Sequence, residues 1–376
     1  MSVMIVPVDQ DADLRFMDAA LALGRRGLGR TAPNPSVGAL VVKDGIIIGR
    51  GWTAAGGRPH GEPLALAQAG SAAKGATIYV TLEPCSHHGQ TPPCCEAIVA
   101  AGISRVVYAV GDPNPDIAGR GAAYCRDHGL AVVAGIDEAA ARRDHLGHIL
   151  RMTEHRPTIT LKFAETADGF AAGGRHDPRL SITGVAANGM VHVMRAMHDA
   201  IMVGAGTVLA DDPLMTVRLP GVQAKPLRVI LDGGLRLPLQ SRLVQTASDA
   251  PILLLTRSES LDARGAQFEA IEGLEIIAAP ITGSGALDLR AALRLLADRG
   301  ITRIFSEGGP TVGSALIADG LADEVILFQA QKPLGREGVP TMTRGARDIL
   351  RDPTRYRHSE NLEVGTDRLH RFERIS

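Results

Sequence analysis

The chain has 376 residues, of which 45% are hydrophobic and 22% charged, a composition typical of a globular protein of two or three domains. Its net charge of −1 and its 3% of aromatic residues argue against a nucleic-acid-binding surface and against attraction to an anionic membrane. The sequence has no run of about 18 apolar residues that would predict a membrane span. Residues 1–16 lack the features of a secretory signal, so we expect a cytoplasmic protein.

The first half of the chain predicts a complete α/β domain. Residues 14–27 place apolar side chains at helical spacing and end in glycine, which predicts a first helix. Residues 37–42 and 46–52 flank an Asp-Gly turn, a pattern typical of a β-hairpin. The elements expected next are a helix starting at His60, a strand at 76–84, a helix at 94–102, a strand at 105–110, a helix at 119–129 and a strand at 130–136. This alternation favours a layered five-stranded sheet within residues 1–150.

A polar helical stretch, residues 137–157, ends at Pro157 and marks the expected domain boundary. A second α/β pattern follows, which we assign to a second domain over residues 157–376. Its expected strands lie near 158–169, 200–206, 227–232, 251–256, 302–309 and 323–331, with helices near 186–198 and 287–300. Residues 345–376 predict a final strand or hairpin. The two halves do not resemble each other, which indicates a fusion of two different domains.

Three candidate zinc ligands come from the starts of two predicted helices. His60 opens one helix, and Cys94 opens the next, nine residues after Cys85; the positive end of a helix favours the thiolate form of cysteine. Zinc binds imidazole and thiolate, and a catalytic zinc keeps one position for water. Glu62, two residues after His60, is within reach of that water as a general acid and base. An H-x-E motif followed by a Pro-Cys…Cys element is the signature of zinc deaminases.

Other interpretations of the metal-ligating residues stay open at this point. A closed structural zinc site would take a fourth ligand from His87 or His88, which could instead serve a substrate phosphate, a proton path or only solvation. Cys95 should point away from the metal, and Cys125 should be a small core residue. Clustered cysteines without an export signal favour metal binding or catalysis over disulfides.

Two stretches of the second half contain candidate binding residues. Residues 308–311, Gly-Gly-Pro-Thr, connect a predicted strand to a helix, where backbone N–H groups can meet a phosphate, although many such turns bind nothing. The spacing is not G-x-G-x-x-G, so a Rossmann fingerprint is not supported. Asp211 and Asp212 precede Pro213, and this pattern is more typical of a turn with one capping aspartate than of a metal site.

Both halves resemble one known family. The first half closely resembles the deaminase half of the bifunctional riboflavin-biosynthesis deaminase/reductase family. The stretches that carry this resemblance are TLEPCSHHGQTPPCCEAIVAAG and, upstream of it, PNPSVGALVVKDG. Eight residues separate Cys85 from Cys94, which is the normal form in that family, whereas most deaminases have P-C-x-x-C. Three later stretches resemble the reductase half of this family: LKFAETADG, GAGTVLADDPLMTVR and SEGGPTVGSAL. The fold of that half is similar to dihydrofolate reductase. The resemblance covers roughly residues 14–340.

The resemblance implies roles for individual residues. In the deaminase, His60, Cys85 and Cys94 would bind Zn²⁺, Glu62 would be catalytic, and Asn34 would contact the pyrimidine or, alternatively, only shape its turn. The positions implied for NADPH are Ala164, Ser181, Thr207, Asp211, Gly309, Pro310, Thr311, Val312, Gly313, Ser314 and Ala315. Those implied for the ribose phosphate of the substrate are Arg179, Arg195, Met215, Arg218 and Glu307. From the residues alone, Arg195 could equally be a charge on a helix surface.

Two positions depart from the family pattern. The family usually has alanine where this chain has Gly61, a loss of one methyl from which we expect little effect. The family often has tryptophan at the position of Ser181 and serine near that of Arg179. If that ring normally lines the dinucleotide, one contact to NADPH should be missing.

The resemblance implies a two-step enzyme acting on a small pyrimidine nucleotide. The first domain would deaminate 2,5-diamino-6-ribosylamino-4(3H)-pyrimidinone 5′-phosphate, and the second would reduce the ribosyl group with NADPH to give 5-amino-6-ribitylaminouracil 5′-phosphate. We expect a homo-oligomer with no nucleic-acid or membrane partner. One alternative is a nucleotide or tRNA base deaminase with an appended non-reductase binding domain. Another is a non-catalytic zinc-stabilised binding protein, in which a fourth protein ligand closes the site and Glu62 has no role.

Overall fold

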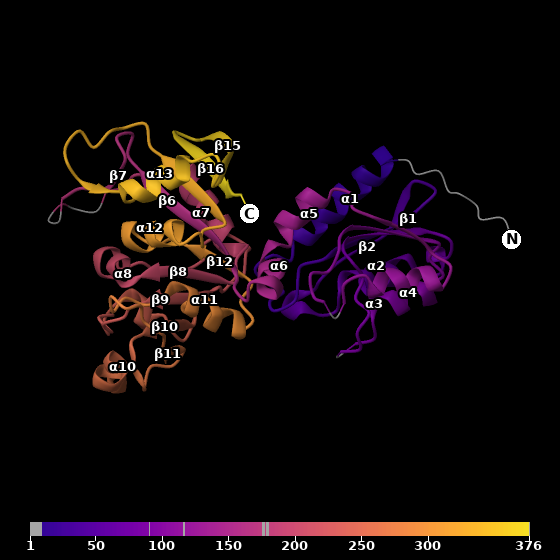
Figure 1. Cartoon of the computed structure of the whole chain (residues 1–376), viewed down its shortest axis with the longest axis horizontal. Coiled ribbons are helices and arrows are strands. Elements are labelled where there is room, and N and C mark those ends of the chain that lie inside the picture. The colour runs from indigo at the N-terminus through magenta and orange to yellow at the C-terminus, as the bar shows by residue number, and fades with distance from the viewer. Residues whose placement is uncertain (1–9, 90, 116, 175–176, 178–179, 376) are drawn as a thin grey trace. The chain divides into compact units, whose positions relative to one another are not determined.

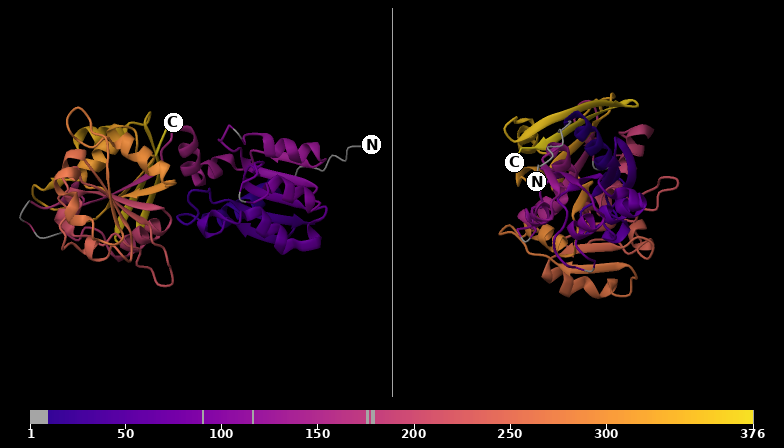
Figure 2. Two further views of the ribbon diagram at one scale, coloured as in Figure 1. Left: turned by 90° about the horizontal axis from the view of Figure 1, so that it is seen from below. Right: turned by 90° about the vertical axis from the view of Figure 1, so that its right-hand side faces the viewer.

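The computed structural model describes residues 10–89, 91–115, 117–174, 177 and 180–375. The chain divides into two compact units, the first ending at His155 and the second starting at Arg156 (Figure 1). Each unit has helices packed around its own sheet, as the further views in Figure 2 show, so the prediction of a two-domain α/β protein is confirmed. Among the described residues, no helix has the length and apolar character needed to cross a membrane.

The first unit is built on a five-stranded sheet of order β2-β1-β3-β4-β5. Strand β1 is antiparallel to β2 and β3, whereas β3, β4 and β5 are parallel. The strands are β1 (Gly38–Lys43), β2 (Ile46–Trp52), β3 (Thr77–Leu82), β4 (Arg105–Val110) and β5 (Ala131–Ala134). The helices are α1 (Gln10–Arg25), α2 (Gly61–Ala69), α3 (Cys94–Ala100), α4 (Arg120–Asp127), α5 (Glu138–Asp144) and α6 (Leu146–Thr153), with 3₁₀ turns at Ala55–Gly57 and Gly70–Ala73.

The helical stretch predicted over residues 137–157 is two helices rather than one. Helices α5 and α6 meet at His145, which has φ −94° and ψ 7°. The bend points the imidazole inward, where its Nε2 lies 3.0 Å from Oγ1 of Thr81 in β3. A buried polar contact with the sheet therefore sets the helix direction, which the local sequence pattern did not reveal.

Helix α2 lies unusually close to strand β2 because two strand residues have no side chain. A Cβ at Gly49 would stand 2.1 Å from the carbonyl oxygen of Ala65, and a Cβ at Gly51 would stand 2.1 Å from that of Gly61. Neither distance is possible for real atoms, so these two glycines permit direct contact between helix and strand backbones. The same contact fixes the start of α2, which carries His60 and Glu62.

The second unit is built on a nine-stranded sheet of order β11-β10-β9-β8-β12-β6-β13-β16-β15. It is parallel from β11 to β13, and β16 and β15 add an antiparallel edge. The strands are β6 (Thr158–Glu165), β8 (Ala200–Gly204), β9 (Leu227–Leu231), β10 (Ile252–Thr256), β11 (Leu274–Ala278), β12 (Arg303–Ser306), β13 (Glu324–Gln329), β15 (Tyr356–Val364) and β16 (Asp367–Arg374). Strands β7 (Phe170–Ala172) and β14 (Val339–Pro340) form a separate pair.

Helices cover both faces of this sheet. Helices α11 and α12 bury Leu296 and Leu316 against one face, and α7 buries Val191 against the other. The helices are α7 (Val185–Ala196), α8 (Ala205–Asp211), α9 (Arg242–Gln245), α10 (Ser258–Arg264), α11 (Leu289–Asp298), α12 (Pro310–Ala318) and α13 (Arg344–Arg351), with a 3₁₀ turn at Gly265–Phe268. The predicted C-terminal hairpin is β15 and β16, but α13 precedes it. Edge strand β11 was not predicted, because its five residues are only partly buried or exposed and carry little pattern.

A buried ion pair fastens the start of the second unit. Arg156, which is 4% exposed, donates to both carboxylate oxygens of Asp323, at 2.7 and 2.8 Å. The same carboxylate accepts a bond of 2.9 Å from the backbone N–H of Ile159 in β6 and one of 3.1 Å from Arg374 in β16. The first residue of the unit is thereby joined to the central strand β6 and to β16, the strand next to the edge.

Arg228→Ala should strongly destabilise the second unit. Arg228 is fully buried in β9, and its guanidinium donates to carbonyl oxygens in the 243–250 segment, including that of Thr246 at 2.9 Å. Burial lowers its pKa to about 10, so it stays charged at neutral pH. Alanine would leave a cavity and several unpaired carbonyls, and we expect a loss of about 3 kcal/mol or more in the free energy of unfolding. Urea denaturation measures this, with exposed Arg242→Ala as a control that should change little.

Candidate active sites

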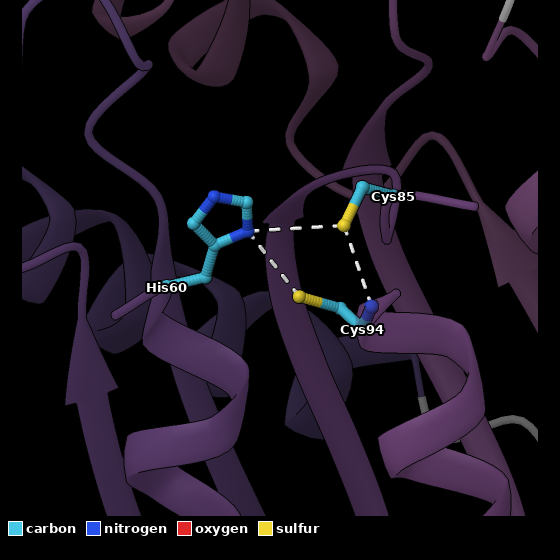
Figure 3. Close-up of side chains that lie close together, drawn as sticks. All are labelled: His60, Cys85 and Cys94. Carbon is cyan, nitrogen blue, oxygen red and sulfur yellow. Dashed lines mark hydrogen bonds between the residues drawn. The ribbon is translucent and has the colours of Figure 1, made fainter. Parts of the chain in front are cut away.

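Three side chains in the first unit converge at the carboxyl end of β3 (Figure 3). His60 is the N-cap residue of α2, Cys94 is the first residue of α3, and Cys85 lies on the segment between β3 and α3. Nδ1 of His60 lies 3.3 Å from Sγ of Cys94 and 3.8 Å from Sγ of Cys85. All three ligand atoms lie within 4.8 Å of one another, so the structure brings together the three predicted metal ligands.

The electrostatics of this cluster suit a metal-binding thiolate. The backbone N–H of Cys94 donates to Sγ of Cys85 at 3.3 Å. A hydrogen bond from the Cys94 side chain and a further one with His60 lower the pKa of the Cys85 thiol to about 4, against the opposing effect of burial. For Cys94 the same contact, together with burial, raises the pKa instead. The lowered pKa of Cys85 favours its thiolate, the form of cysteine that binds zinc.

Glu62 lies directly beside the three ligands. Its side chain belongs to the first turn of α2, and the residue is 3% exposed. Its Oε2 has no hydrogen-bond partner among the described residues. Burial raises the pKa of this carboxyl, although the neighbouring His60 lowers it. A buried carboxylate with one unsatisfied oxygen needs a partner that the protein does not supply, and a solvent molecule held by a metal meets that need.

The donor set fits zinc with one coordination position left for water. One imidazole and two thiolates are ligands that zinc prefers, and no fourth protein donor joins the group in the described part of the chain. His87 and His88 are exposed, and His88 pairs instead with Glu96 at 3.0 Å. Cys95 and Cys125 are buried in the hydrophobic core, so the expectation for Cys125 is confirmed. This arrangement argues against a closed structural site.

Glu83 is a residue of the first site whose role the sequence did not reveal. It is 3% exposed, and its carboxylate accepts backbone N–H bonds from Gly119 at 3.0 Å and from Ala122 at 3.1 Å. Glu83 therefore ties the turn that carries Cys85 to the start of α4. In the sequence, Glu83 stands immediately before Pro-Cys, which could have drawn attention to it. A glutamate at that position is equally compatible with a catalytic role and with a structural role in holding the turn.

Asn34 lies on the loop that packs against the turn before His60. Its Nδ2 donates to the carbonyl oxygen of Gly57 at 2.9 Å. Gly57 has φ +85°, and a Cβ there would stand 2.5 Å from Nδ2 of Asn34, so only glycine fits this contact. The amide thus shapes the turn, as the alternative interpretation held, and the residue is half-buried.

Gly61→Ala should destabilise the first unit, although the sequence led us to expect little effect. A Cβ at Gly61 would stand 2.7 Å from the carbonyl oxygen of Val37 and 3.1 Å from Cα of Trp52. Both atoms are backbone and cannot move away cheaply. Alanine gains up to about 1 kcal/mol of helix propensity, whereas overpacking costs about 1–3 kcal/mol. We expect a lower melting temperature and weaker zinc retention. Gly189→Ala, in an open position of α7, is the control that should show neither.

In the second unit, candidate residues meet at the carboxyl ends of β8 and β12. Oγ1 of Thr207, in α8, accepts a 3.1 Å bond from the backbone N–H of Gly309, which caps α12. Pro310 occupies the first turn of that helix. The first backbone N–H groups of a helix lack partners within it and can bind a phosphate. The predicted cofactor residues Thr207, Gly309 and Pro310 thus lie together at this edge of the sheet, and Ala164 lies near the end of the neighbouring strand β6.

The residues predicted around the cofactor do not all face the same way. Thr311 is exposed and Val312 and Ala315 are half-buried, whereas Gly313 packs against Phe163 of β6. Oγ of Ser314 accepts a bond of 2.9 Å from the backbone N–H of Thr343, so that side chain faces α13. Of the residues predicted to bind the cofactor, Gly313 and Ser314 thus pack α12 against its neighbours.

A second set of predicted residues surrounds a buried ion pair. Arg195, from α7, donates to both carboxylate oxygens of Glu307 at 2.5 and 2.9 Å and to the carbonyl oxygen of Thr216 at 2.9 Å. Burial raises the pKa of Glu307, but Arg195 more than offsets this, so the pKa is lowered. Arg195 is 9% exposed and is therefore not the helix-surface charge of the alternative interpretation.

Two further basic residues adjoin this pair and were not predicted. Nδ1 of His192 accepts a 3.3 Å bond from the backbone N–H of Arg218, and burial together with both arginines lowers the pKa of His192. Lys162, from β6, also helps to lower the pKa of Glu307. The pattern L-K-F-A contained Lys162, but nothing in a single strand showed which charges it would meet.

The remaining predicted residues take less direct positions. The side chain of Met215 is 2% exposed within a hydrophobic core cluster, so only its main chain can face a ligand. Ser181 is exposed, and Asp211 ends helix α8. Asp212 accepts a 2.8 Å bond from the backbone N–H of Arg242 at the start of α9, a partner far along the chain and not in its own turn. Arg179 lies outside the described residues.

Comparison with known proteins gives both units a family. Residues 10–110 match the cytidine and deoxycytidylate deaminase zinc-binding region, and residues 157–366 match the RibD C-terminal domain. The riboflavin biosynthesis protein RibD of Aquifex aeolicus is 37% identical, over 97% of this chain and 99% of its own. The chain belongs to the RibD family. It is thus a bifunctional deaminase/reductase of riboflavin biosynthesis, with a zinc-binding deaminase domain and a reductase domain that uses a nicotinamide cofactor.

Solved structures agree over the whole chain. RibD of Acinetobacter baumannii superposes with a TM-score of 0.83 at 33% identity, covering 98% of this chain and 100% of its own. A diaminohydroxyphosphoribosylaminopyrimidine deaminase/5-amino-6-(5-phosphoribosylamino)uracil reductase from Thermotoga maritima gives 0.82 at 34% identity, covering 97% and 99%. RibD of Escherichia coli is 38% identical over 94% of this chain and 97% of its own. The second unit is therefore a reductase domain and not an unrelated binding module.

Proposed function

We propose that the first unit deaminates 2,5-diamino-6-ribosylamino-4(3H)-pyrimidinone 5′-phosphate by hydrolysis. The second unit then reduces the ribosyl group with NADPH, which gives 5-amino-6-ribitylaminouracil 5′-phosphate. The observation that carries the proposal is the three-ligand cluster of His60, Cys85 and Cys94 beside the buried Glu62, in a chain whose other unit is a RibD reductase domain.

In the deaminase site, His60, Cys85 and Cys94 hold zinc, and Glu62 moves the protons. Bound zinc supplies Lewis acidity that makes water a competent nucleophile near neutral pH. Oε2 of Glu62 accepts a proton from the attacking water and delivers it to the leaving amine, which departs as ammonia. The burial of Glu62 supports this role, since a raised carboxyl pKa makes the proton easier to hold between the two transfers. The side-chain amide of Asn34 contacts the edge of the pyrimidine.

In the reductase site, one set of residues binds the cofactor and a second set binds the substrate. NADPH supplies the hydride when bound. Its binding falls to Thr207 and to the backbone at the start of α12, residues 309–311, with Ala164, Ser181 and Asp211 as further proposed contacts. The substrate is held by Arg218 and by the Arg195–Glu307 pair, with Arg179 and the main chain of Met215 completing the set. A guanidinium binds phosphate in a bidentate manner, and a carboxylate fixes ribose hydroxyls.

One experiment follows both steps at once. The purified protein, loaded with zinc, receives the diaminopyrimidinone nucleotide with and without NADPH, and ammonia and the absorbance at about 340 nm typical of reduced nicotinamide are recorded. We expect ammonia in both cases and NADPH oxidation only after deamination. A chelator should abolish ammonia release while leaving reduction of the deaminated nucleotide intact. Reduction without any zinc-dependent ammonia release would refute the assignment of the first unit.

Two further properties belong to the proposal. A homo-oligomer and a cytoplasmic location stay predictions for this chain. Size-exclusion chromatography with light scattering measures the first, and localisation of a tagged chain measures the second. The substrate is a free nucleotide, and the near-neutral charge gives no reason to expect a nucleic-acid partner.

A further inference from the structure

We propose that Arg58 binds the phosphate group of the pyrimidine nucleotide in the deaminase site. This inference rests on the proposed function and adds a specificity-determining residue to it. The deaminated ring and the 5′-phosphate lie at opposite ends of the substrate, so a cation beside the metal cluster, but not part of it, is needed to distinguish a nucleotide from a nucleoside. Arg58 is such a cation, two residues before His60.

The backbone on both sides of Arg58 is held in place. The preceding residue, Gly57, is fixed by the hydrogen bond from Nδ2 of Asn34 at 2.9 Å. The following residue, Pro59, accepts a bond of 3.0 Å from the backbone N–H of Ala54. The Cα of Arg58 therefore has a fixed position between the loop of Asn34 and the first zinc ligand, which suits a binding residue.

The side chain of Arg58 extends to the segment between the two cysteine ligands. Its Nη1 donates to Oγ1 of Thr91 at 2.5 Å, and its Nη2 lies 3.3 Å from where a Cβ on Gly89 would stand. Gly89 and Thr91 both lie between Cys85 and Cys94. The guanidinium thus connects the His60 side of the metal cluster with the segment between the two cysteine ligands.

The charge of Arg58 is not neutralised by the protein. Across the described ranges, Arg58 forms no ion pair with a carboxylate, and its guanidinium donates to the neutral hydroxyl of Thr91. The residue is half-buried, so its charge is only partly screened by water. A guanidinium has five donors in a planar fork, and a bond to one hydroxyl leaves donors for a phosphate. The neighbouring His88 is a weaker candidate because it is occupied by Glu96.

The test compares two substrates in the zinc-loaded full-length protein. Arg58→Ala should lower kcat/KM for deamination of the nucleotide about 10- to 100-fold, mainly through KM, because a charge-assisted bidentate contact is lost. The corresponding nucleoside, which has no phosphate, should be deaminated at nearly the same rate by both proteins. Inorganic phosphate should inhibit nucleoside deamination by the wild type and inhibit Arg58→Ala much less. Arg58→Lys should recover part of the effect, since lysine keeps the charge but not the fork.

Two control variants separate phosphate binding by Arg58 from other roles. Arg50→Ala removes an exposed arginine of β2 and should leave both substrates unaffected. Thr91→Val keeps the charge but removes the hydroxyl contact; if it matches Arg58→Ala for both substrates, Arg58 only fastens the loop and the inference is wrong. Equal losses for nucleotide and nucleoside in Arg58→Ala would overturn it too. A wild-type protein that deaminates neither substrate would instead contradict the proposed function.

Discussion

Glu62→Gln should strongly slow ammonia release while the protein keeps its zinc. Glutamine has nearly the shape of glutamate but cannot accept and return a proton, so the loss falls on proton transfer and not on the three ligands. General acid–base catalysis contributes about 10²- to 10⁴-fold to such reactions, and we expect a fall in the deamination rate of that order. Steady-state ammonia release and metal content measured on the same preparation provide the check.

The control for Glu62→Gln lies on the neighbouring helix. Glu96 is also in the first turn of a helix beside the cluster, but its side chain is 37% exposed and pairs with His88. Glu96→Gln should therefore retain zinc and deaminate at close to the wild-type rate. Reduction of the already deaminated nucleotide should be unchanged in both variants. Wild-type deamination by Glu62→Gln would show that another group carries the proton.

Glu307→Gln should slow the reductase step about 100-fold while leaving the deaminase step intact. The carboxylate is nearly buried, with its side chain 14% exposed, and it orients Arg195 through two hydrogen bonds. The amide removes the negative charge, so the guanidinium loses its orienting partner and the substrate loses an acceptor. NADPH oxidation with the deaminated nucleotide measures the fall, and ammonia release from the first substrate serves as the internal reference.

A matched pair elsewhere in the same unit tests whether Glu307 acts at the site. Glu324, in β13, pairs with Arg371 and is partly buried, but it lies at the start of its strand and not at the carboxyl end. Glu324→Gln should leave NADPH oxidation near its normal rate. If both variants lose the same activity, or if Glu307→Gln lowers the melting temperature enough to explain the loss, the role of Glu307 is structural.

The metal cluster could be predicted because its chemistry is carried by rare residue types close to helix starts. Histidine and cysteine at helix starts, in the order H-x-E and then Pro-Cys…Cys, specify zinc chemistry with few alternatives. Glu83 could not be assigned in the same way. Its function depends on backbone N–H groups at Gly119 and Ala122, more than thirty residues away in sequence, and no local pattern records that distance.

The reductase residues were harder to predict for a related reason. Ser314 and Met215 lie in stretches that resemble the family, yet the side chain of one bonds to the backbone of α13 and the other is buried in the core. Which face of a helix or loop meets a ligand depends on tertiary packing, which a motif does not specify. His192 and Lys162 illustrate the converse, because each gains its importance from charges on other strands and helices.

Helices and strands could be predicted from the periodicity of apolar residues wherever the face with those residues is also the buried face. The β1–β2 hairpin, with its Asp-Gly turn, and the alternating elements that follow it were predicted nearly residue by residue. The stretch of residues 137–157 is largely helical as predicted, but a bend at His145, where the imidazole contacts Thr81, divides it into two helices. The sequence also predicted little effect of exchanging glycine and alanine at residue 61. The structure predicts destabilisation by alanine instead, because the backbone of Val37 occupies the space that a methyl group would need.

The ion pair between Arg156 and Asp323 determines where the two catalytic halves can be produced as separate polypeptides. A reductase fragment that begins at Pro157 would omit Arg156 and leave a deeply buried carboxylate short of its main counterion. A fragment that begins a few residues earlier would retain it, and the deaminase fragment could stop at the end of α6 without losing any of its own strands. Whoever separates the two activities for independent study should therefore leave this arginine with the downstream piece.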